Sequence, residues 1–237
     1  MTPAAIVFLA VAVLAGAFLQ GATGIGFAML VAPLAGLVDP GFVPVAILIW
    51  MLPLNAFVAW RERHRIDLRG AGWITIARVL ATPLGIGLLA LIPPSGLGYL
   101  IGGSTILAAL VSLLAPAFTP SPAAFLAAGA LTGLSETATG VGGPPLALVY
   151  QHRPAAEMRA TVALCFLVGE VISLIGLAIS GRFLGSGLTT SLWLLPAVVI
   201  GVWLSSLVHR RVGGRGLRYG ILIFAIVSGI AVILQTL

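Results

Sequence analysis

The sequence predicts an all-α polytopic membrane protein built as an inverted repeat, in which each half is a broken re-entrant helical hairpin followed by three transmembrane helices. Three observations predict this fold. Hydrophobic residues make up 60% of the 237 residues and charged residues only 8%, which excludes an ordinary soluble domain. One six-residue string occurs twice. Most of the arginines lie in three short stretches between apolar segments.

The repeated string divides the chain nearly in half. Ala22-Thr23-Gly24-Ile25-Gly26-Phe27 is followed 116 positions later by Ala138-Thr139-Gly140-Val141-Gly142-Gly143. Such a repeat indicates a duplicated unit, and we expect a first membrane repeat over residues 1–118 and a second, inverted one over 119–237. Glycine costs a helix about 1 kcal/mol relative to alanine, so each Gly-x-Gly pair predicts a break in a helix. Broken helices at matching positions of two halves are typical of a transporter's binding site.

The apolar segments can be compared with the roughly 20 residues that cross a bilayer as a helix. Two segments contain the repeated string, Ala4–Leu37 and Ala123–Tyr150, and each is too long for one crossing and too short for two. Six others are uninterrupted: Gly41–Trp60, Gly72–Ile92, Leu97–Ala115, Met158–Ser180, Leu188–Val208 and Leu217–Leu237.

The arginines predict how these segments are oriented. Four lie between positions 61 and 69, two at 153 and 159, and four between 210 and 218, and the positive-inside rule places all three groups on the cytoplasmic side. If both interrupted segments crossed once, the first group would face away from the other two. We therefore expect the second interrupted segment to enter and leave on the same side, as a re-entrant helical hairpin. The net charge of +6 is then a property of these loops and requires no nucleic-acid partner.

The charges leave open whether the first interrupted segment is a hairpin or a single crossing, because both choices keep the three arginine groups inside. The duplication favours a hairpin, since each repeat then has an odd number of crossings and the second copy is inverted. This arrangement predicts both chain termini on the extracytoplasmic side. It also predicts that the two Gly-x-Gly tips meet near the middle of the membrane, where irregular backbone is tolerated only if protein or a polar cavity surrounds it.

The residues that follow each tip favour an anion site. A helix is expected to restart at Phe27 and at Pro144, and a helix start offers unpaired N–H donors and a partial positive charge. The predicted substrate-binding residues are Thr23, Gly24, Ile25, Gly26, Phe27, Thr139, Gly140, Val141, Gly142, Gly143, Pro144 and Arg78. The alternative is that glycine and threonine in the tips only allow close helix packing, as small residues do in membranes.

Three charged residues fall inside or beside apolar spans, where a charge is costly and indicates function. Arg78 is a candidate cationic wall for an anion, or a side chain that extends toward the cytoplasm. Glu136 and Glu170 are candidates for carrying a coupling proton, or for a structural ion pair with Arg78. Gln20 holds the position of Glu136 in the first repeat, so only one side of the predicted site is ionisable.

The tip motifs also carry a resemblance to a known family. Gly21-Ala22-Thr23-Gly24-Ile25-Gly26-Phe27 and Gly140-Val141-Gly142-Gly143-Pro144-Pro145, in a duplicated apolar chain of this size, resemble the TauE/SafE family of sulfite exporters and related permeases. The resemblance covers essentially the whole chain. It implies a multi-pass secondary transporter (permease) in the bacterial inner (plasma) membrane that moves a small sulfur-containing or organic anion, such as sulfite, a sulfonate or sulfoacetate.

We expect alternating access of the two repeats around the glycine tips, and the alternative is a cation or proton exchanger that uses Glu136 and Glu170. An enzyme is not expected, because the histidines lie outside the apolar spans and no serine is spaced against a histidine. Cys165 is the only cysteine, which excludes an internal disulfide. The sequence predicts no cofactor and no metal. Its expected partners are the small anion and the lipid bilayer, and homo-oligomer formation stays open.

Overall fold

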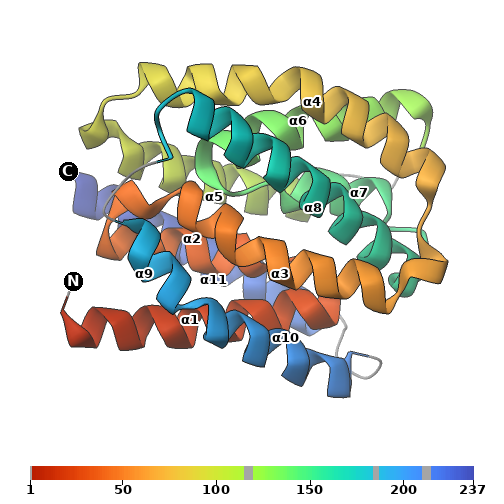
Figure 1. The fold of residues 1–237 in the computed structure, drawn as a ribbon, viewed down its shortest axis with the longest axis horizontal. Coiled ribbons are helices and arrows are strands. Elements are labelled where there is room, and N and C mark those ends of the chain that lie inside the picture. Colours follow the sequence, from red (N-terminus) through yellow and green to blue (C-terminus); the bar gives the residue numbers. More distant parts are fainter. Residues whose placement is uncertain (1, 115–119, 184–186, 210–214) are drawn as a thin grey trace.

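The computed structural model describes residues 2–114, 120–183, 187–209 and 215–237, and within these ranges its regular secondary structure is entirely helical. Figure 1 shows the helices running mostly along one direction. Among the described residues, six helices are long and apolar enough to cross a membrane: Pro3–Thr23, Leu68–Leu91, Pro94–Leu114, Ala155–Ile179, Leu188–Val208 and Tyr219–Thr236. The fold agrees with the predicted all-α polytopic membrane protein.

The elements follow the chain in this order. The first half contains α1 (Pro3–Thr23), α2 (Phe27–Val38), η1 (Pro40–Phe42), α3 (Val45–Arg61), η2 (Arg63–Arg65), α4 (Leu68–Leu91), η3 (Pro94–Gly96) and α5 (Leu97–Leu114). The second half contains α6 (Pro122–Thr139), α7 (Gly143–Val149), α8 (Ala155–Ile179), α9 (Gly187–Trp193), α10 (Leu195–Val208) and α11 (Arg215–Thr236).

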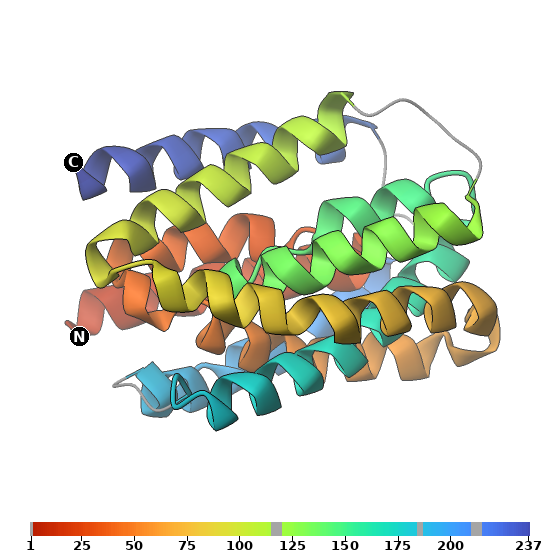
Figure 2. The ribbon, with the colours of Figure 1, turned by 90° about the horizontal axis from the view of Figure 1, so that it is seen from above.

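Both predicted breaks are present. The first separates α1 from α2 and the second separates α6 from α7, although α7 begins at Gly143, one residue before the predicted Pro144. The chain reverses direction at each break, so that α2 packs back against α1 and α7 against α6. Figures 1 and 2 show that α1 begins at the left end of the molecule and α6 at the right end. The two broken segments therefore enter the bundle from opposite ends.

Three of the predicted spans differ in detail from the helices. The segment Gly41–Trp60 forms η1 and a shorter helix of 17 residues, α3. Helix α4 begins before Gly72, because the Asp67 carboxylate accepts the Gly70 N–H at 3.0 Å and caps an earlier start. The segment Leu188–Val208 is divided into α9 and α10 because Pro196, which is disfavoured in a helix interior, lies at the start of α10. Residue 115, the predicted end of one span, lies outside the described residues.

Glycines bring several helices into backbone contact. On α6, a Cβ added to Gly133 would lie 2.7 Å from the carbonyl oxygen of Arg78 on α4. On α11, a Cβ added to Gly229 would lie 2.9 Å from the carbonyl oxygen of Gly102 on α5. On α10, one added to Gly201 would lie 2.9 Å from Ala17 Cβ on α1. Small residues at such contacts are the usual means of packing helices in membranes.

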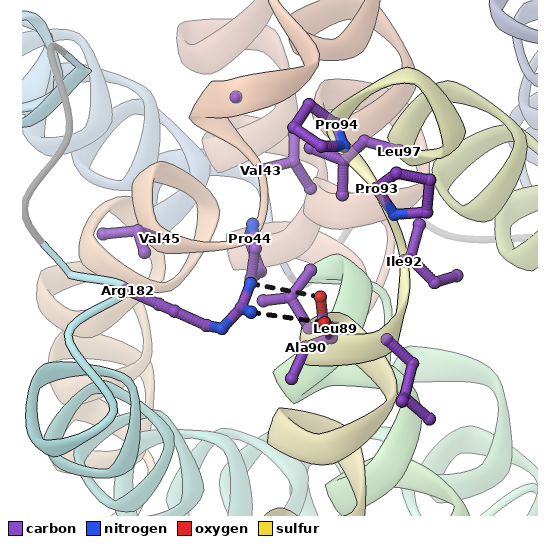
Figure 3. Close-up of a pocket in the computed structure, with 12 residues that line it drawn as sticks. Val43, Pro44, Val45, Leu89, Ala90, Ile92, Pro93, Pro94, Leu97 and Arg182 are labelled. Atoms are coloured by element: carbon purple, nitrogen blue, oxygen red, sulfur yellow. Dashed lines mark hydrogen bonds between the residues drawn. The ribbon is translucent and has the colours of Figure 1, made fainter.

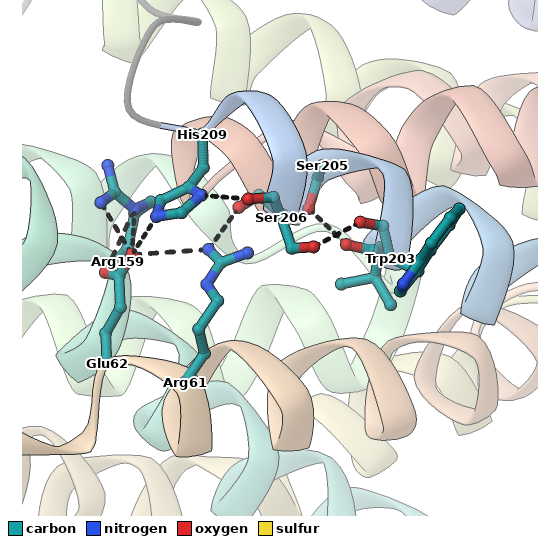
Figure 4. A network of polar contacts seen from close by, with 9 residues as sticks. Arg61, Glu62, Arg159, Trp203, Ser205, Ser206 and His209 are labelled. Carbon is teal, nitrogen blue, oxygen red and sulfur yellow. Dashed lines mark hydrogen bonds and ion pairs between the residues drawn. The ribbon is translucent and has the colours of Figure 1, made fainter.

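Side chains from the first two arginine-rich stretches, and His209 directly before the third, form one network of polar contacts (Figure 4). This network lies where α3 and α10 end and α8 begins, at one end of the molecule (Figure 1). Arg159 of α8 donates to the Glu62 carboxylate, which follows α3, with an Nη2 to Oε1 distance of 2.8 Å. His209, which follows α10, has its Nε2 3.7 Å from the same Oε1. Arg61 at the end of α3 donates to the Gly21 carbonyl oxygen at 2.8 Å. Burial lowers the pKa of His209, and the nearby Arg61 and Arg159 guanidinium groups lower it further.

For the first two arginine groups the shared end agrees with the prediction, and His209, directly before the third group, lies there too. Figure 1 places both chain termini at the opposite end. Residues 210 and 211, and the side chains of 215 and 218, lie outside what the structure describes.

Candidate functional site

Positive φ angles shape both tips. Gly24 and Gly140 end α1 and α6 with φ of +91° and +75°, and their N–H groups donate to the carbonyl oxygens of Gln20 and Glu136 at 2.7 Å each. These four residues occupy matching positions in the two copies. Gly26 has a φ of +118°. Glycine is the residue that adopts such angles readily, which explains why each tip contains it.

Gly142 is required for a different reason. Its φ is −134°, which any residue adopts. However, a Cβ at this position would lie 2.8 Å from the Cβ and Oε2 of Glu136 and 2.9 Å from Thr132 Cγ2. The missing side chain therefore makes room for the Glu136 carboxyl directly behind the second tip.

The tip threonines share two backbone contacts in both copies, and the Thr23 hydroxyl also lies 2.6 Å from the Ile25 carbonyl oxygen. The hydroxyl of Thr23 lies 2.8 Å from the Leu19 carbonyl oxygen and that of Thr139 lies 2.8 Å from the Ser135 carbonyl oxygen. Each hydroxyl oxygen also accepts the N–H two residues later, at 3.4 Å in the first tip and 3.3 Å in the second. These hydroxyls stabilise the helix breaks, so a substrate would have to displace a backbone bond to reach them.

The two tips contact each other. A Cβ added to Gly143 would lie 3.9 Å from the Cβ and Cγ2 of Ile25, so the Ile25 side chain lies against the backbone of the second tip. Phe27 and Val141 are buried, as are Gly24, Gly26, Gly140, Gly142, Gly143 and Pro144. The structure thus brings the predicted tip residues together in the interior of the protein.

Arg78 is fully buried and does not extend to the surface. Its guanidinium forms an ion pair with Glu136, which is also fully buried, and Nη1 donates to the Cys165 carbonyl oxygen at 3.1 Å. The guanidinium carbon lies 5.7 Å from the centroid of the Phe166 ring. Arg78 is therefore a fixed positive charge beside the second tip, since Glu136 contacts both.

Glu170 on α8 is the second buried carboxyl group. Its Oε1 accepts from Asn55 Nδ2 at 2.6 Å, whereas Oε2 has no hydrogen-bond partner among the described residues. Glu170 follows Gly169, which lies against the Arg78 guanidinium. Arg78, Glu136 and Glu170 are all fully buried, and two ionised carboxylates with one guanidinium would leave one negative charge uncompensated, which is costly. Charge balance therefore favours one neutral carboxyl group in this set.

A chain of amide groups connects Glu170 to the first tip. The Phe27 N–H donates to Gln20 Oε1 at 3.0 Å, and Gln20 Nε2 donates to Asn55 Oδ1 at 3.0 Å. A backbone N–H can only donate, so it fixes the orientation of both amides, and Asn55 must then donate to Glu170. Asn55 is not among the residues predicted from the sequence. The available signal was an amide inside the otherwise apolar helix α3.

The two halves of the site are therefore unequal. Gln20 caps the start of α2 through the Phe27 N–H, whereas Glu136, at the matching position of the second repeat, turns to Arg78. The first tip is held by neutral amides and the second lies beside an ion pair.

The chain matches the family model described as Sulfite exporter TauE/SafE over residues 8–232. The chain belongs to the TauE/SafE family. No curated protein and no solved structure matches it. TauE/SafE proteins are membrane transporters, which agrees with the six apolar helices.

A transporter of this family needs a place where a small anion meets compensating charge. In the described part of the chain, Arg78 is the fully buried arginine and lies beside the second tip. Arg159, which is 7% exposed and paired with Glu62, lies beside Gly24 of the first tip. No group of three or more His, Cys, Asp or Glu side chains that could hold a metal ion occurs among the described residues.

Proposed function

We propose that this TauE/SafE protein is a secondary transporter that moves a small sulfur-containing or organic anion, such as sulfite, a sulfonate or sulfoacetate, across the bacterial inner membrane by alternating access. The observation that carries the proposal is the fully buried ion pair of Arg78 and Glu136 behind the second glycine tip. A guanidinium presents a planar fork of N–H donors that matches the oxygens of a carboxylate or sulfur oxyanion.

The pairing suggests how substrate and proton are exchanged. An anion that approaches Arg78 competes with the Glu136 carboxylate for the same donors. When the anion displaces the Glu136 carboxylate from Arg78, that carboxylate is left buried without its cation, which is costly. Glu136 is therefore expected to take up a proton. Glu170 is the other fully buried carboxyl group, and its Oε2 has no hydrogen-bond partner among the described residues, which makes it the second candidate for carrying the proton. Anion binding and proton binding are thereby linked.

The helix packing supports two inverted repeats, residues 1–118 and 119–237, each with a re-entrant hairpin. In the two halves α1 corresponds to α6, and α4 corresponds to α10. Helix α4 packs along α6, and the corresponding pair of helices, α10 and α1, packs in the same way. The exchange also maps the α3 and α8 pair onto itself, and likewise the α5 and α11 pair. Two related units arranged in opposite senses can rock against each other to expose one site in turn to each side.

Topology can be tested separately. We expect reporter fusions placed before Thr2 and after Leu237 to show both termini on the extracytoplasmic side, opposite the arginine-rich end. A cytoplasmic N-terminus would mean that the first broken segment crosses the membrane, and the inverted repeat would then be wrong.

Function can be tested by ligand stabilisation of the purified protein and by counterflow in proteoliposomes, using sulfite, sulfonates, sulfoacetate and carboxylates. A ligand at 100 times its dissociation constant stabilises a protein by about 2.7 kcal/mol, which a thermal-shift assay detects. Arg78→Gln should remove the anion response. Arg153→Gln is the matched control, because Arg153 is about half exposed and pairs only weakly, at 3.7 Å, with Glu157.

The same assays address the cation or proton exchanger that Glu136 and Glu170 also suggest. The pairing of Glu136 with Arg78 disfavours a cation site, since a bound cation would lie beside a buried guanidinium. If stabilisation and exchange depend on a cation and none of the anions has an effect, the anion-transporter proposal is wrong and the cation or proton exchanger is supported.

A further inference from the structure

A cavity of about 520 Å³ lies at the end of the molecule that carries the chain termini (Figure 3). Its wall is formed where α3 begins, where α4 ends and where α5 begins, together with Arg182, which follows α8. This volume is in the range of small-molecule sites. The cavity is separate from the buried site at Arg78.

Arg182 supplies a cation to this cavity. Its Nη1 donates to the Leu89 carbonyl oxygen at 3.1 Å and its Nη2 to the Ala90 carbonyl oxygen at 3.4 Å, as Figure 3 shows. These carbonyls belong to the end of α4, where carbonyl groups lack helical partners. The two bonds hold the guanidinium at the cavity wall and, among the described contacts, use two of its five N–H donors.

The surrounding backbone contributes partial charges of both signs, because the negative end of α4 lies at the same wall as two helix starts. Helices α3 and α5 both begin at the cavity wall, at Val45 and Leu97, and helix starts carry partial positive charge. The start of α3 has no side-chain cap. Asp39, which precedes η1, accepts the N–H of the cavity-lining Gly41 at 2.8 Å and caps η1. The cavity thus combines a guanidinium with two helix starts.

Three leucines separate this cavity from the buried charges. Leu89 lines the cavity and also packs in a cluster with Leu48 and Leu177, whose exposures are 5%, 0% and 0%. Along α4, Arg78 lies eleven residues before Leu89, or about 16 Å at the helical rise. Along α8, Glu170 lies seven residues before Leu177, or about 10 Å. The leucine cluster is therefore an apolar layer between the cavity and the site.

We propose that the cavity is an outer vestibule, which binds a small oxyanion or carboxylate at Arg182, and that the cluster of Leu48, Leu89 and Leu177 is the gate between the vestibule and the buried site. The chemical class of the ligand rests on the proposed function, whereas the cavity, its cation and the leucine layer do not. Binding at Arg182 would raise the local anion concentration outside the closed gate.

The vestibule is tested by anion binding in a protein that lacks the buried site. Arg78→Gln combined with Glu136→Gln removes both buried charges together, which avoids leaving one unpaired. This double variant should still bind sulfite or sulfoacetate weakly, and adding Arg182→Gln should weaken that residual binding by about tenfold or more, as expected for the loss of a charge-assisted bond. Adding Arg182→Lys should restore part of it, and adding Arg153→Gln should change nothing.

The outcomes separate the two proposals. No residual binding in the double variant, or residual binding that is insensitive to Arg182→Gln, overturns the vestibule while leaving the buried anion site intact. No anion binding by the unmodified protein overturns both.

The gate is tested with the chain's only cysteine. Cys165 is 1% exposed and its carbonyl oxygen bonds to Arg78, so its thiol reports access to the buried site. A small membrane-impermeant thiosulfonate reagent, applied to proteoliposomes from the side of the chain termini, should modify Cys165 several times faster after Leu48→Ala and Leu177→Ala.

Leu54→Ala is the matched control for the gate. Leu54 is equally buried on α3 but lies six residues from Leu48, about 9 Å toward the arginine-rich end. The gate proposal is overturned if Cys165 stays protected in the double alanine variant. It is also overturned if Cys165 reacts as fast in Leu54→Ala as in the double alanine variant.

Discussion

Gly169 of α8 leaves the space that the Arg78 guanidinium of α4 occupies, because a Cβ at position 169 would overlap Arg78 Nε. The pairing of Arg78 with Glu136 therefore depends on a residue that forms no polar contact with either. A glycine in a long helix has a conformational cost of about 1 kcal/mol relative to alanine, and at this position the cost is offset by room for a buried charge.

Gly169→Ala is expected to push the guanidinium out of its place and to weaken the ion pair with Glu136. Breaking a buried pair costs about 3–5 kcal/mol, so the melting temperature should fall and anion affinity should fall with it. Gly87→Ala on α4 is the control, because a Cβ there meets nothing within 4 Å. Equal thermal stability and equal affinity of the two variants would contradict this role of Gly169.

Glu136→Gln and Glu170→Gln test which carboxyl carries the coupling proton. If either does, its glutamine variant should lose gradient-driven transport but keep substrate binding and exchange, since the amide stays neutral throughout the cycle. Proteoliposome uptake driven by a pH gradient, compared with counterflow at equal pH, separates the two activities. Full proton-driven uptake by both variants would remove these residues from the coupling.

Asn55→Asp tests the amide chain between the first tip and Glu170. The new carboxylate cannot donate to Glu170 Oε1, and it places a second negative charge at a contact that is now 2.6 Å. Protonation restores a donor, so transport by the variant should be present at acid pH and lost as the pH rises, relative to the unmodified protein. The pH profile of transport measures this. Gln20→Glu can still accept the Phe27 N–H, so this variant should change transport less than Asn55→Asp does. Identical profiles for Asn55→Asp and the unmodified protein would show that the chain has no role.

Gly26→Ala and Gly142→Ala test the tips. Alanine at 26 would be strained at a φ of +118° although space is available, at a cost of about 1–3 kcal/mol. Alanine at 142 would instead displace Glu136. Both should lower anion affinity, measured on protein that is monodisperse in detergent.

Gly103→Ala, whose Cβ meets nothing within 4 Å, is the control for the tips. Gly229 is unsuitable because it packs on the Gly102 backbone. Normal binding by tip variants that assemble poorly would favour close packing as the role of these glycines.

The predictable parts of this fold are those with a local cause. The helix breaks at Gly24 and Gly140 follow from glycine within apolar sequence, and the shared end of the arginine-rich stretches follows from charge. The chain from Gln20 through Asn55 to Glu170 joins residues 35 and 115 positions apart, and no local pattern specifies such contacts. The leucine gate was equally hidden, because nothing in the sequence distinguishes Leu48 from the many other leucines.

The contacts of Glu62 have a consequence for the speed of transport. Glu62 pairs with Arg159 of α8, whose stem packs beside Gly24, and the preceding Arg61 donates to the Gly21 carbonyl oxygen of α1. The end of α1 therefore cannot separate from α3 without breaking a bond from a charged side chain. Opening at the arginine-rich end must therefore break charged contacts that include an ion pair, whereas opening at the other end separates the leucine cluster and the bonds from Arg182 to two neutral carbonyl oxygens. We expect the two half-cycles to differ in activation enthalpy, with the larger activation enthalpy for opening at the arginine-rich end. Equal temperature dependence of transport in the two directions would contradict this asymmetry.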